Sequence, residues 1–139
     1  MTIQEVKDYL KRAYYIDKRI GVLQDEISML ESRLYKCTST YSHVGGSNQP
    51  TFEVTLNKII TYRDRMSKEV GELIDIKNSI EHTINMLDDS KSRLIMQQRY
   101  ILFRRFEDIA KDLNIDVRQV YRLHKKSLEN LSNVIECQY

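Results

Sequence analysis

Three side chains with forked hydrogen-bonding groups stand within two helical turns of one another in the segment VRQVYR, residues 117–122. They are Arg118, Gln119 and Arg122, and on a helix they would project away from Val117 and Val120. Arginine and glutamine match the hydrogen-bonding edges of guanine and adenine in the major groove of DNA. This pattern predicts a helix that reads DNA bases, whereas a helix that is merely charged and solvated is the alternative interpretation.

Positive charge is concentrated around these three residues. Residues 91–126 hold 10 Lys and Arg against 4 Asp and Glu, a net charge of +6, although the whole chain carries only +2. Such a local excess of positive charge attracts the phosphates of a nucleic acid. We expect contacts with the DNA backbone from Arg99, Tyr121, Lys125 and Lys126.

A second helix is predicted directly before the base-reading helix, in the segment FEDIAKDLNID, residues 106–116. Asn114 tolerates the left-handed conformation that ends a helix, and Asp116 can cap the helix that follows. Ala110 is small at the point where the two helices would approach most closely. These features together predict a helix-turn-helix. Its core is expected to contain Phe106, Ile109, Ala110, Leu113, Ile115, Val120 and Leu123.

A further helix is expected over residues 91–103, which makes a three-helix DNA-binding domain of residues 89–139. Its inward-facing residues would be Leu94, Ile95, Ile101 and Leu102. The last helix would bury Val117, Val120, Leu123, Leu128 and Leu131. The helix break at residues 114–116, the cap at Asp116, the small Ala110 and the basic face of the last helix all occur in one short segment. DNA binding is therefore favoured over a solvated charged surface.

The segment LIMQQRYILFRRFEDIAKDLNIDVRQVYRLHKKSLENL resembles region 4 of sigma-70-type factors. It is more similar to phage-encoded transcriptional regulators of the ArpU/RinA type, which have RY, then an aromatic–E–x–I–A helix, then a V–Y–R–x–H–x–x–x–L helix. The matching residues are Arg99, Tyr100, Phe106, Ile109, Ala110, Val120, Tyr121, Arg122, His124 and Leu128. The resemblance implies a phage or prophage protein that activates late-gene transcription by binding upstream DNA.

Two long apolar stripes occupy the first 88 residues, with apolar side chains at steps of three and four. The first predicts a helix from about Thr2 to Lys36, with one slip of phase between Leu10 and Ile16. The second predicts a helix that begins after Thr51, which would act as its N-cap.

The connection between the two stripes, residues 37–50, contains the only proline and two of the four glycines, and is expected to be a flexible loop. Two stripes joined in this way predict a long antiparallel, coiled-coil-like hairpin over residues 1–88. The expected fold is therefore all-α, with this hairpin followed by the C-terminal helix-turn-helix domain.

The second stripe is wider than one pairing seam requires, because Ile59–Ile60, Met66 and Ile74 extend it. We therefore expect the hairpin to join copies of the chain into a homo-oligomer, which would bring several DNA-reading heads together and raise avidity. A monomeric hairpin that is stable alone is the alternative.

No pattern of residues indicates an enzyme, a metal site or a bound cofactor. His43, His82 and His124 lack a second ligand at suitable spacing, and Cys37 and Cys137 stand far apart in the sequence. We expect no small-molecule substrate. The chain lacks an apolar run long enough to cross a membrane, and its first residues lack the core of a signal peptide, so the cytoplasm of a bacterial host is the expected location.

Two other functions remain open from the sequence. Small terminase subunits of phages also join a helix-turn-helix to oligomerising helices, although there the DNA-binding module usually comes first. A helical adaptor that holds RNA polymerase is the other alternative. The expected partners are double-stranded DNA and further copies of the chain, with host RNA polymerase as an additional candidate.

Overall fold

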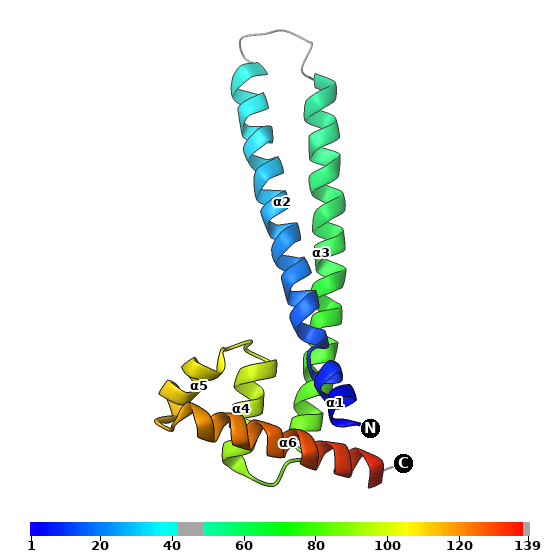
Figure 1. The fold of residues 1–139 in the computed structure, drawn as a ribbon. Coiled ribbons are helices and arrows are strands. Elements are labelled where there is room, and N and C mark those ends of the chain that lie inside the picture. The colour runs from blue at the N-terminus through cyan, green and yellow to red at the C-terminus, as the bar shows by residue number, and fades with distance from the viewer. Residues whose placement is uncertain (42–48, 138–139) are drawn as a thin grey trace. The chain divides into compact units, whose positions relative to one another are not determined.

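The computed structural model describes residues 1–41 and 49–137, and within these ranges all regular structure is α-helical, which confirms the all-α prediction (Figure 1). The helices are α1 (Ile3–Leu10), α2 (Arg12–Tyr41), α3 (Gln49–Ile84), α4 (Ser90–Tyr100), α5 (Phe106–Leu113) and α6 (Val117–Cys137). In the same described ranges, none of the helices is both long and apolar enough to cross a membrane.

The chain divides into two compact units, which are described here one at a time. The hairpin unit comprises Ile16–Glu72, and the C-terminal unit comprises Met1–Tyr15 together with Leu73–Tyr139. The C-terminal unit is therefore larger than the residues 89–139 expected from the sequence. It takes in the N-terminal helix α1 and the last turns of α3.

The hairpin unit pairs α2 with α3 in opposite directions (Figure 1). Its buried side chains on α2 are Ile16, Ile20, Leu23 and Ile27, and on α3 they are Thr55 and Ile59. These positions follow the steps of three and four that keep one face of a helix against its partner. Ion pairs between the helices join Arg19 to Glu69 at 3.1 Å, and Arg63 to Glu31.

Helix α3 exposes only part of the wide apolar face that the sequence predicted. Ile59 is buried and Met66 is half-buried, because both belong to the heptad-spaced row of α3 that contains the buried Thr55 and Leu73. Counting these two residues as surplus surface was wrong. Ile60 and Ile74 are exposed, as the sequence predicted.

The expected limits of the loop and of the second helix were also wrong. Helix α2 continues to Tyr41 and α3 already begins at Gln49, so Thr51 lies inside the helix and is not its N-cap. Pro50 explains the earlier start, because a proline in the first turn of a helix loses no hydrogen bond and already has a helical φ angle. Only residues 42–48 of the predicted loop lie between the helices, and these are outside the described residues.

The predicted single helix from Thr2 to Lys36 is interrupted at Lys11, which separates α1 from α2. The interruption falls within the phase slip between Leu10 and Ile16. Thr2 caps α1: its hydroxyl accepts from the backbone N–H of Glu5 at 3.2 Å, and the Glu5 carboxylate accepts from the N–H of Thr2 at 2.8 Å.

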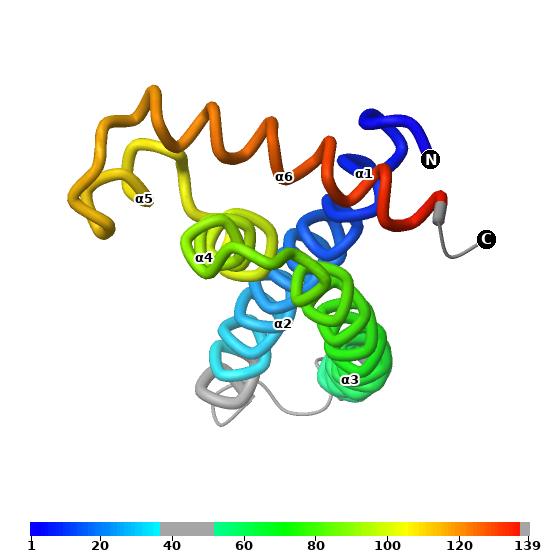
Figure 2. The backbone as a smooth tube through the Cα atoms, turned by 90° about the horizontal axis from the view of Figure 1, so that it is seen from below, coloured from blue at the N-terminus to red at the C-terminus, as the bar shows by residue number. Residues whose placement is uncertain are grey.

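In the C-terminal unit, α6 is the central helix. Helices α4 and α5 pack along its first part and α1 packs along its second part (Figure 2). Val6 and Leu10 of α1 are completely buried, as is Leu131 of α6. Helix α1 therefore contributes to the core that supports the C-terminal helices.

Helix α4 buries only part of the face that was predicted. Ile95 is completely buried, as predicted, together with Met96 and Tyr100, and Ile101 is half-buried. Leu94 and Leu102 are exposed, so the prediction that these two leucines point inward was wrong. The helix ends at Tyr100 rather than at residue 103, and Phe103 adopts a left-handed backbone conformation with φ 59°. The early end turns Leu102 away from the core.

Candidate functional site

Helices α5 and α6 are joined by a sharp turn that is held by several hydrogen bonds. Asn114 has left-handed φ 54° and ψ 43°, which ends α5, and its N–H donates to the carbonyl oxygens of Ala110 and Lys111. The Asp116 carboxylate then accepts from the backbone N–H of Arg118 at 3.0 Å, one of the free donors at the start of α6. The turn residues thus occupy the positions that the sequence assigned to them.

Beneath this turn lies one apolar cluster, whose buried members come from three helices. Ile95 of α4, Ile109 and Ala110 of α5, and Val120 of α6 form its centre. The partly buried residues packed against it are Phe106, Leu113, Ile115, Val117 and Leu123. All seven residues expected in a helix-turn-helix core are in this cluster, so α5 and α6 are held at a fixed angle to each other.

The three predicted base-reading residues lie together on the first two turns of α6. With Asp116 they line a shallow hollow of about 270 Å³. Arg118 and Arg122 are exposed, and Gln119 is half-buried. Their polar ends therefore meet solvent on the side of α6 that lies away from Val120.

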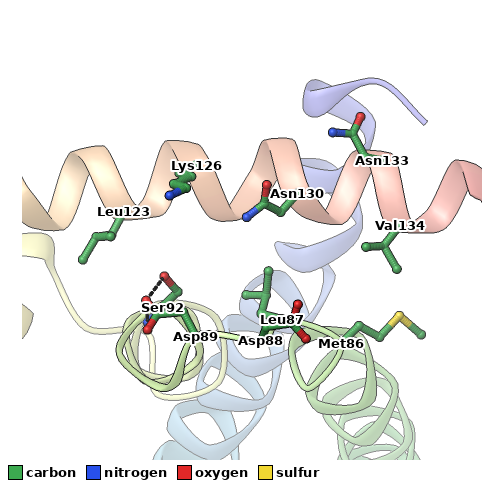
Figure 3. Close-up of a pocket in the computed structure, with 10 residues that line it drawn as sticks. All are labelled: Met86, Leu87, Asp88, Asp89, Ser92, Leu123, Lys126, Asn130, Asn133 and Val134. Atoms are coloured by element: carbon green, nitrogen blue, oxygen red, sulfur yellow. Dashed lines mark hydrogen bonds between the residues drawn. The ribbon is translucent and has the colours of Figure 1, made fainter.

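The two lysines of α6 that were predicted to contact the DNA backbone lie in different surroundings. Lys125 is exposed on the same side of the helix as Arg122. Lys126 is also exposed, but it lines a second hollow, of about 410 Å³, in which α6 faces the segment between α3 and α4 (Figure 3). Asp88 and Asp89 belong to that segment and line the hollow together with Lys126. Lys125 is not part of this lining.

One of these acids has a structural role of its own. The Asp89 carboxylate accepts from the backbone N–H of Ser92 at 3.2 Å and from its hydroxyl at 2.7 Å, which caps α4 (Figure 3). These hydrogen bonds, the side-chain one foremost, lower the pKa of Asp89 because they favour its charged form.

Arg99 and Tyr121, predicted to contact phosphates, both pack against the ring of Phe106. The Arg99 guanidinium carbon lies 4.3 Å from the centre of that ring, and the Tyr121 ring centre lies 4.8 Å from it. The Arg99 guanidinium also donates to the carbonyl oxygen of Arg104 at 3.0 Å. Arg99 is thus held by the start of α5, whereas Tyr121 is exposed beside the base-reading residues.

The same aromatic cluster contains a buried polar pair that the sequence analysis did not identify. The Tyr100 hydroxyl and Nε2 of His124 share a hydrogen bond of 2.6 Å, and the His124 ring meets Phe106 edge-on at 4.9 Å. Burial lowers the pKa of His124 to about 4, helped by the charges of Lys7, Arg99 and Lys11. Burial also raises the pKa of Tyr100 to about 12, so both groups are neutral at physiological pH.

A third hollow, of about 350 Å³, lies within the C-terminal unit between the α1–α2 break and the α4–α5 turn. Lys11, Arg99 and Arg105 line it, and there is no acidic residue in its lining, which is otherwise Leu10, Tyr14, Tyr15, Tyr100 and Phe103. Arg105 also binds Asp108 at 3.1 Å. The contribution of Lys11 could not be expected from the sequence, because it depends on the packing of α1 against the C-terminal helices.

A grouping of three or more His, Cys, Asp or Glu side chains suited to a metal ion does not occur among the described residues. Cys37 and Cys137 have no described side chains, and His43 lies outside the described residues. His82 is exposed on α3.

Comparison with known proteins identifies a family whose model covers most of the chain. The family model described as "Protein of unknown function (DUF1492)" matches residues 36–132, which include all of α3, α4 and α5 and most of α6. Neither the search of curated proteins nor that of solved structures gives a match. Since the match covers well over half of the 139 residues, the chain belongs to the DUF1492 family.

Proposed function

We propose that this protein is a sequence-specific, double-stranded DNA-binding transcriptional regulator. The observation that carries the proposal is the grouping of Arg118, Gln119 and Arg122 around one shallow hollow at the start of α6. The first turns of the second helix are the part of a helix-turn-helix that enters the major groove. The side chains there are those that can pair with guanine and adenine edges.

Electrostatics supports the same assignment. The exposed lysine Lys125 follows Arg122 on one side of α6, where a helix leaving the groove meets the phosphate backbone. The hollow lined by Lys11, Arg99 and Arg105 adds cationic groups at the start of α5. Phosphate contacts of this kind supply affinity that is independent of sequence, while the α6 residues supply the preference for particular bases.

The resemblance of residues 94–131 to ArpU/RinA-type regulators extends the proposal to a phage or prophage activator of late genes. Footprinting on phage DNA, with the intact chain, tests this role. Protection upstream of late promoters is the expected result. Protection confined to a packaging locus would instead assign the protein to DNA packaging, like a small terminase subunit. No footprint, together with retention of RNA polymerase on the immobilised protein, would make it a polymerase-binding adaptor.

We also propose that the chain works as a homo-oligomer. Helix α3 exposes Ile60 and Ile74, although it already uses its other face in the hairpin. A single helix-turn-helix reads only a few base pairs, so joining two of them raises the effective concentration of the second reading head. Light scattering on the intact chain tests this: a species of at least twice the chain mass is expected, and a monomer at micromolar concentration refutes it.

A further inference from the structure

Helix α3 carries a second row of residues at steps of three and four, separate from the row that contains Thr55, Ile59 and Leu73. This outer row consists of Glu53, Leu56, Ile60, Arg63, Ser67, Val70, Ile74 and Lys77. Its apolar members are exposed, with exposed fractions of 38% for Leu56, 58% for Ile60, 37% for Val70 and 54% for Ile74. A heptad-spaced apolar row on a solvated helix face is the pattern that pairs with another helix.

The order of polar and apolar positions in the outer row is the same when it is followed from either end. A charged residue is followed by two apolar residues, two polar residues at the centre, two apolar residues and a charged residue of opposite sign. We propose that a second copy of the chain covers this row, with the two α3 helices antiparallel about a two-fold axis level with residue 65. This inference deepens the proposed homo-oligomer and rests on it.

The antiparallel arrangement matches every position of the outer row with a compatible partner. Around this axis, Leu56 meets Ile74 of the second copy, and Ile60 meets Val70 of the second copy. Arg63, whose guanidinium also pairs with Glu31 of its own chain, lies opposite a serine hydroxyl. The carboxylate of Glu53 lies opposite Lys77, whose ammonium nitrogen lies 5.0 Å from the centre of the Phe103 ring in its own chain. The row spans about 36 Å at about 1.5 Å per residue, so the contact extends over several helical turns.

A parallel two-fold pairing of the same row is disfavoured by charge. It would bring each residue against its own copy, and so would oppose two Arg63 guanidinium groups, two Glu53 carboxylates and two Lys77 ammonium groups. Like charges at facing positions destabilise a helix pair, and the pattern of such positions determines helix orientation. The two polar residues at the centre also fix the register, because a shift by one heptad would place Arg63 among apolar side chains.

A glycine beside the outer row leaves room for the second helix. Gly71 is exposed on α3, next to Val70, and a Cβ atom added there would meet nothing within 4 Å in the chain. Packing within the chain therefore does not require glycine, although glycine in a helix costs about 1 kcal/mol relative to alanine. A neighbouring helix that approaches closely would use this space.

Among the described side chains of α2, no equivalent row occurs. The helix exposes Tyr14, Tyr15, Val22, Met29 and Tyr35, but Tyr15, Val22 and Met29 stand seven residues apart, so this face has only one apolar residue in each heptad. Asp25 and Glu26 lie between Val22 and Met29. Such a row is too narrow to form the seam of a helix pair.

Two matched substitutions in the intact chain test the surface. Ile60→Lys places a charge in the outer row, whereas Val54→Lys places the same charge on an equally exposed apolar residue of α3 outside the row. Sedimentation equilibrium should give a dimer for the wild type and for Val54→Lys, with a dissociation constant at least ~100-fold higher for Ile60→Lys. Circular dichroism should show equal helix content in all three, because both residues are exposed. A dimer of unchanged affinity for Ile60→Lys, or an equal loss in Val54→Lys, overturns the proposal.

Orientation is tested by disulfide formation between two singly substituted chains of different tag length, in a background with Cys37→Ser and Cys137→Ser. A mixture of the Arg63→Cys chain with the Ser67→Cys chain should cross-link between the two tags in much higher yield than either chain alone. Preferential cross-linking of the Arg63→Cys chain to itself indicates the parallel pairing and overturns the antiparallel one.

These experiments test the dimer interface separately from DNA recognition. Ile60→Lys should bind DNA less tightly but keep the base preference of the wild type. If the wild type is monomeric and still prefers particular sequences, the oligomer and this interface fail while DNA recognition stands. If the dimer forms but the chain has no sequence preference, the interface stands and the proposed regulatory function fails.

Discussion

The hydroxyl oxygen of Tyr100 lies 2.6 Å from Nε2 of His124, and both side chains are buried although they are 24 residues apart in the chain. Tyr100 ends α4, and His124 lies in the middle of the exposed basic stretch of α6. The pair therefore anchors the helix that carries the base-reading residues to the helix that supports it. Both groups are neutral, so the contact involves no buried charge.

The neutral state of His124 makes stability depend on pH. The folded protein keeps its pKa at about 4, compared with an ordinary value of 6.5, so unfolding takes up a proton between these two pH values. The free energy of unfolding should fall by about 2 kcal/mol from this residue as the pH drops from 7 to 5, and level off below the folded pKa. Urea unfolding at the two pH values measures this.

The matched variants for this measurement are His124→Gln and His82→Gln. His124→Gln should lower the free energy of unfolding at pH 7. The further decrease of this free energy between pH 7 and 5 should be smaller than in the wild type. His82→Gln removes a histidine from an exposed position of α3 and serves as the matched control. An equal loss in the wild type and in His124→Gln would mean that the titration of other groups is responsible.

Helix α1 should be necessary for the stability of the C-terminal unit. Leu10→Ala empties a completely buried site and should lower the free energy of unfolding by about 2–5 kcal/mol. Leu94→Ala removes the same atoms from an exposed site and should cost much less. Similar losses in the two variants would show that α1 does not support the core in solution.

The sequence was informative where the signal is local. The break at residues 114–116 and the apolar spacing on either side of it lie within a few residues of one another, so the turn between α5 and α6 could be predicted. The contact of α1 with α6 and the Tyr100–His124 pair join residues far apart in the chain. Hydrophobic periodicity carries no information about such pairs.

Errors in the predicted face of α4 have a related physical cause. Leu94 and Leu102 are apolar and lie at helical spacing from other apolar residues, yet both are exposed. The buried face includes Ser92, Met96 and Tyr100. Ser92 is satisfied locally by Asp89, whereas the partner that makes Tyr100 suitable for burial, His124, becomes visible only in the fold. Similarly, Pro50 marks the interior of a first turn rather than a loop.

Arg99 and Lys125 should affect DNA binding in different ways. Lys125→Ala should reduce the slope of log affinity against log salt by about one unit and leave protein stability unchanged, because Lys125 is exposed. Arg99→Ala removes the guanidinium that covers Phe106 and binds the Arg104 carbonyl, so it should also destabilise the fold, by about 1 kcal/mol. Salt titrations paired with urea unfolding separate the two effects. A Lys125→Ala protein with the wild-type slope would exclude Lys125 from the interface.

Selection of bound duplexes from a random DNA library, with the wild type and with three single variants, tests the central claim most directly. The wild type should enrich one sequence motif. Arg118→Ala, Gln119→Ala and Arg122→Ala should each relax preference at a particular base pair of that motif, at a cost of about 1–3 kcal/mol in affinity for the full site. Absence of any enriched motif for the wild type, or a uniform weakening on all sequences in every variant, would contradict base reading by α6.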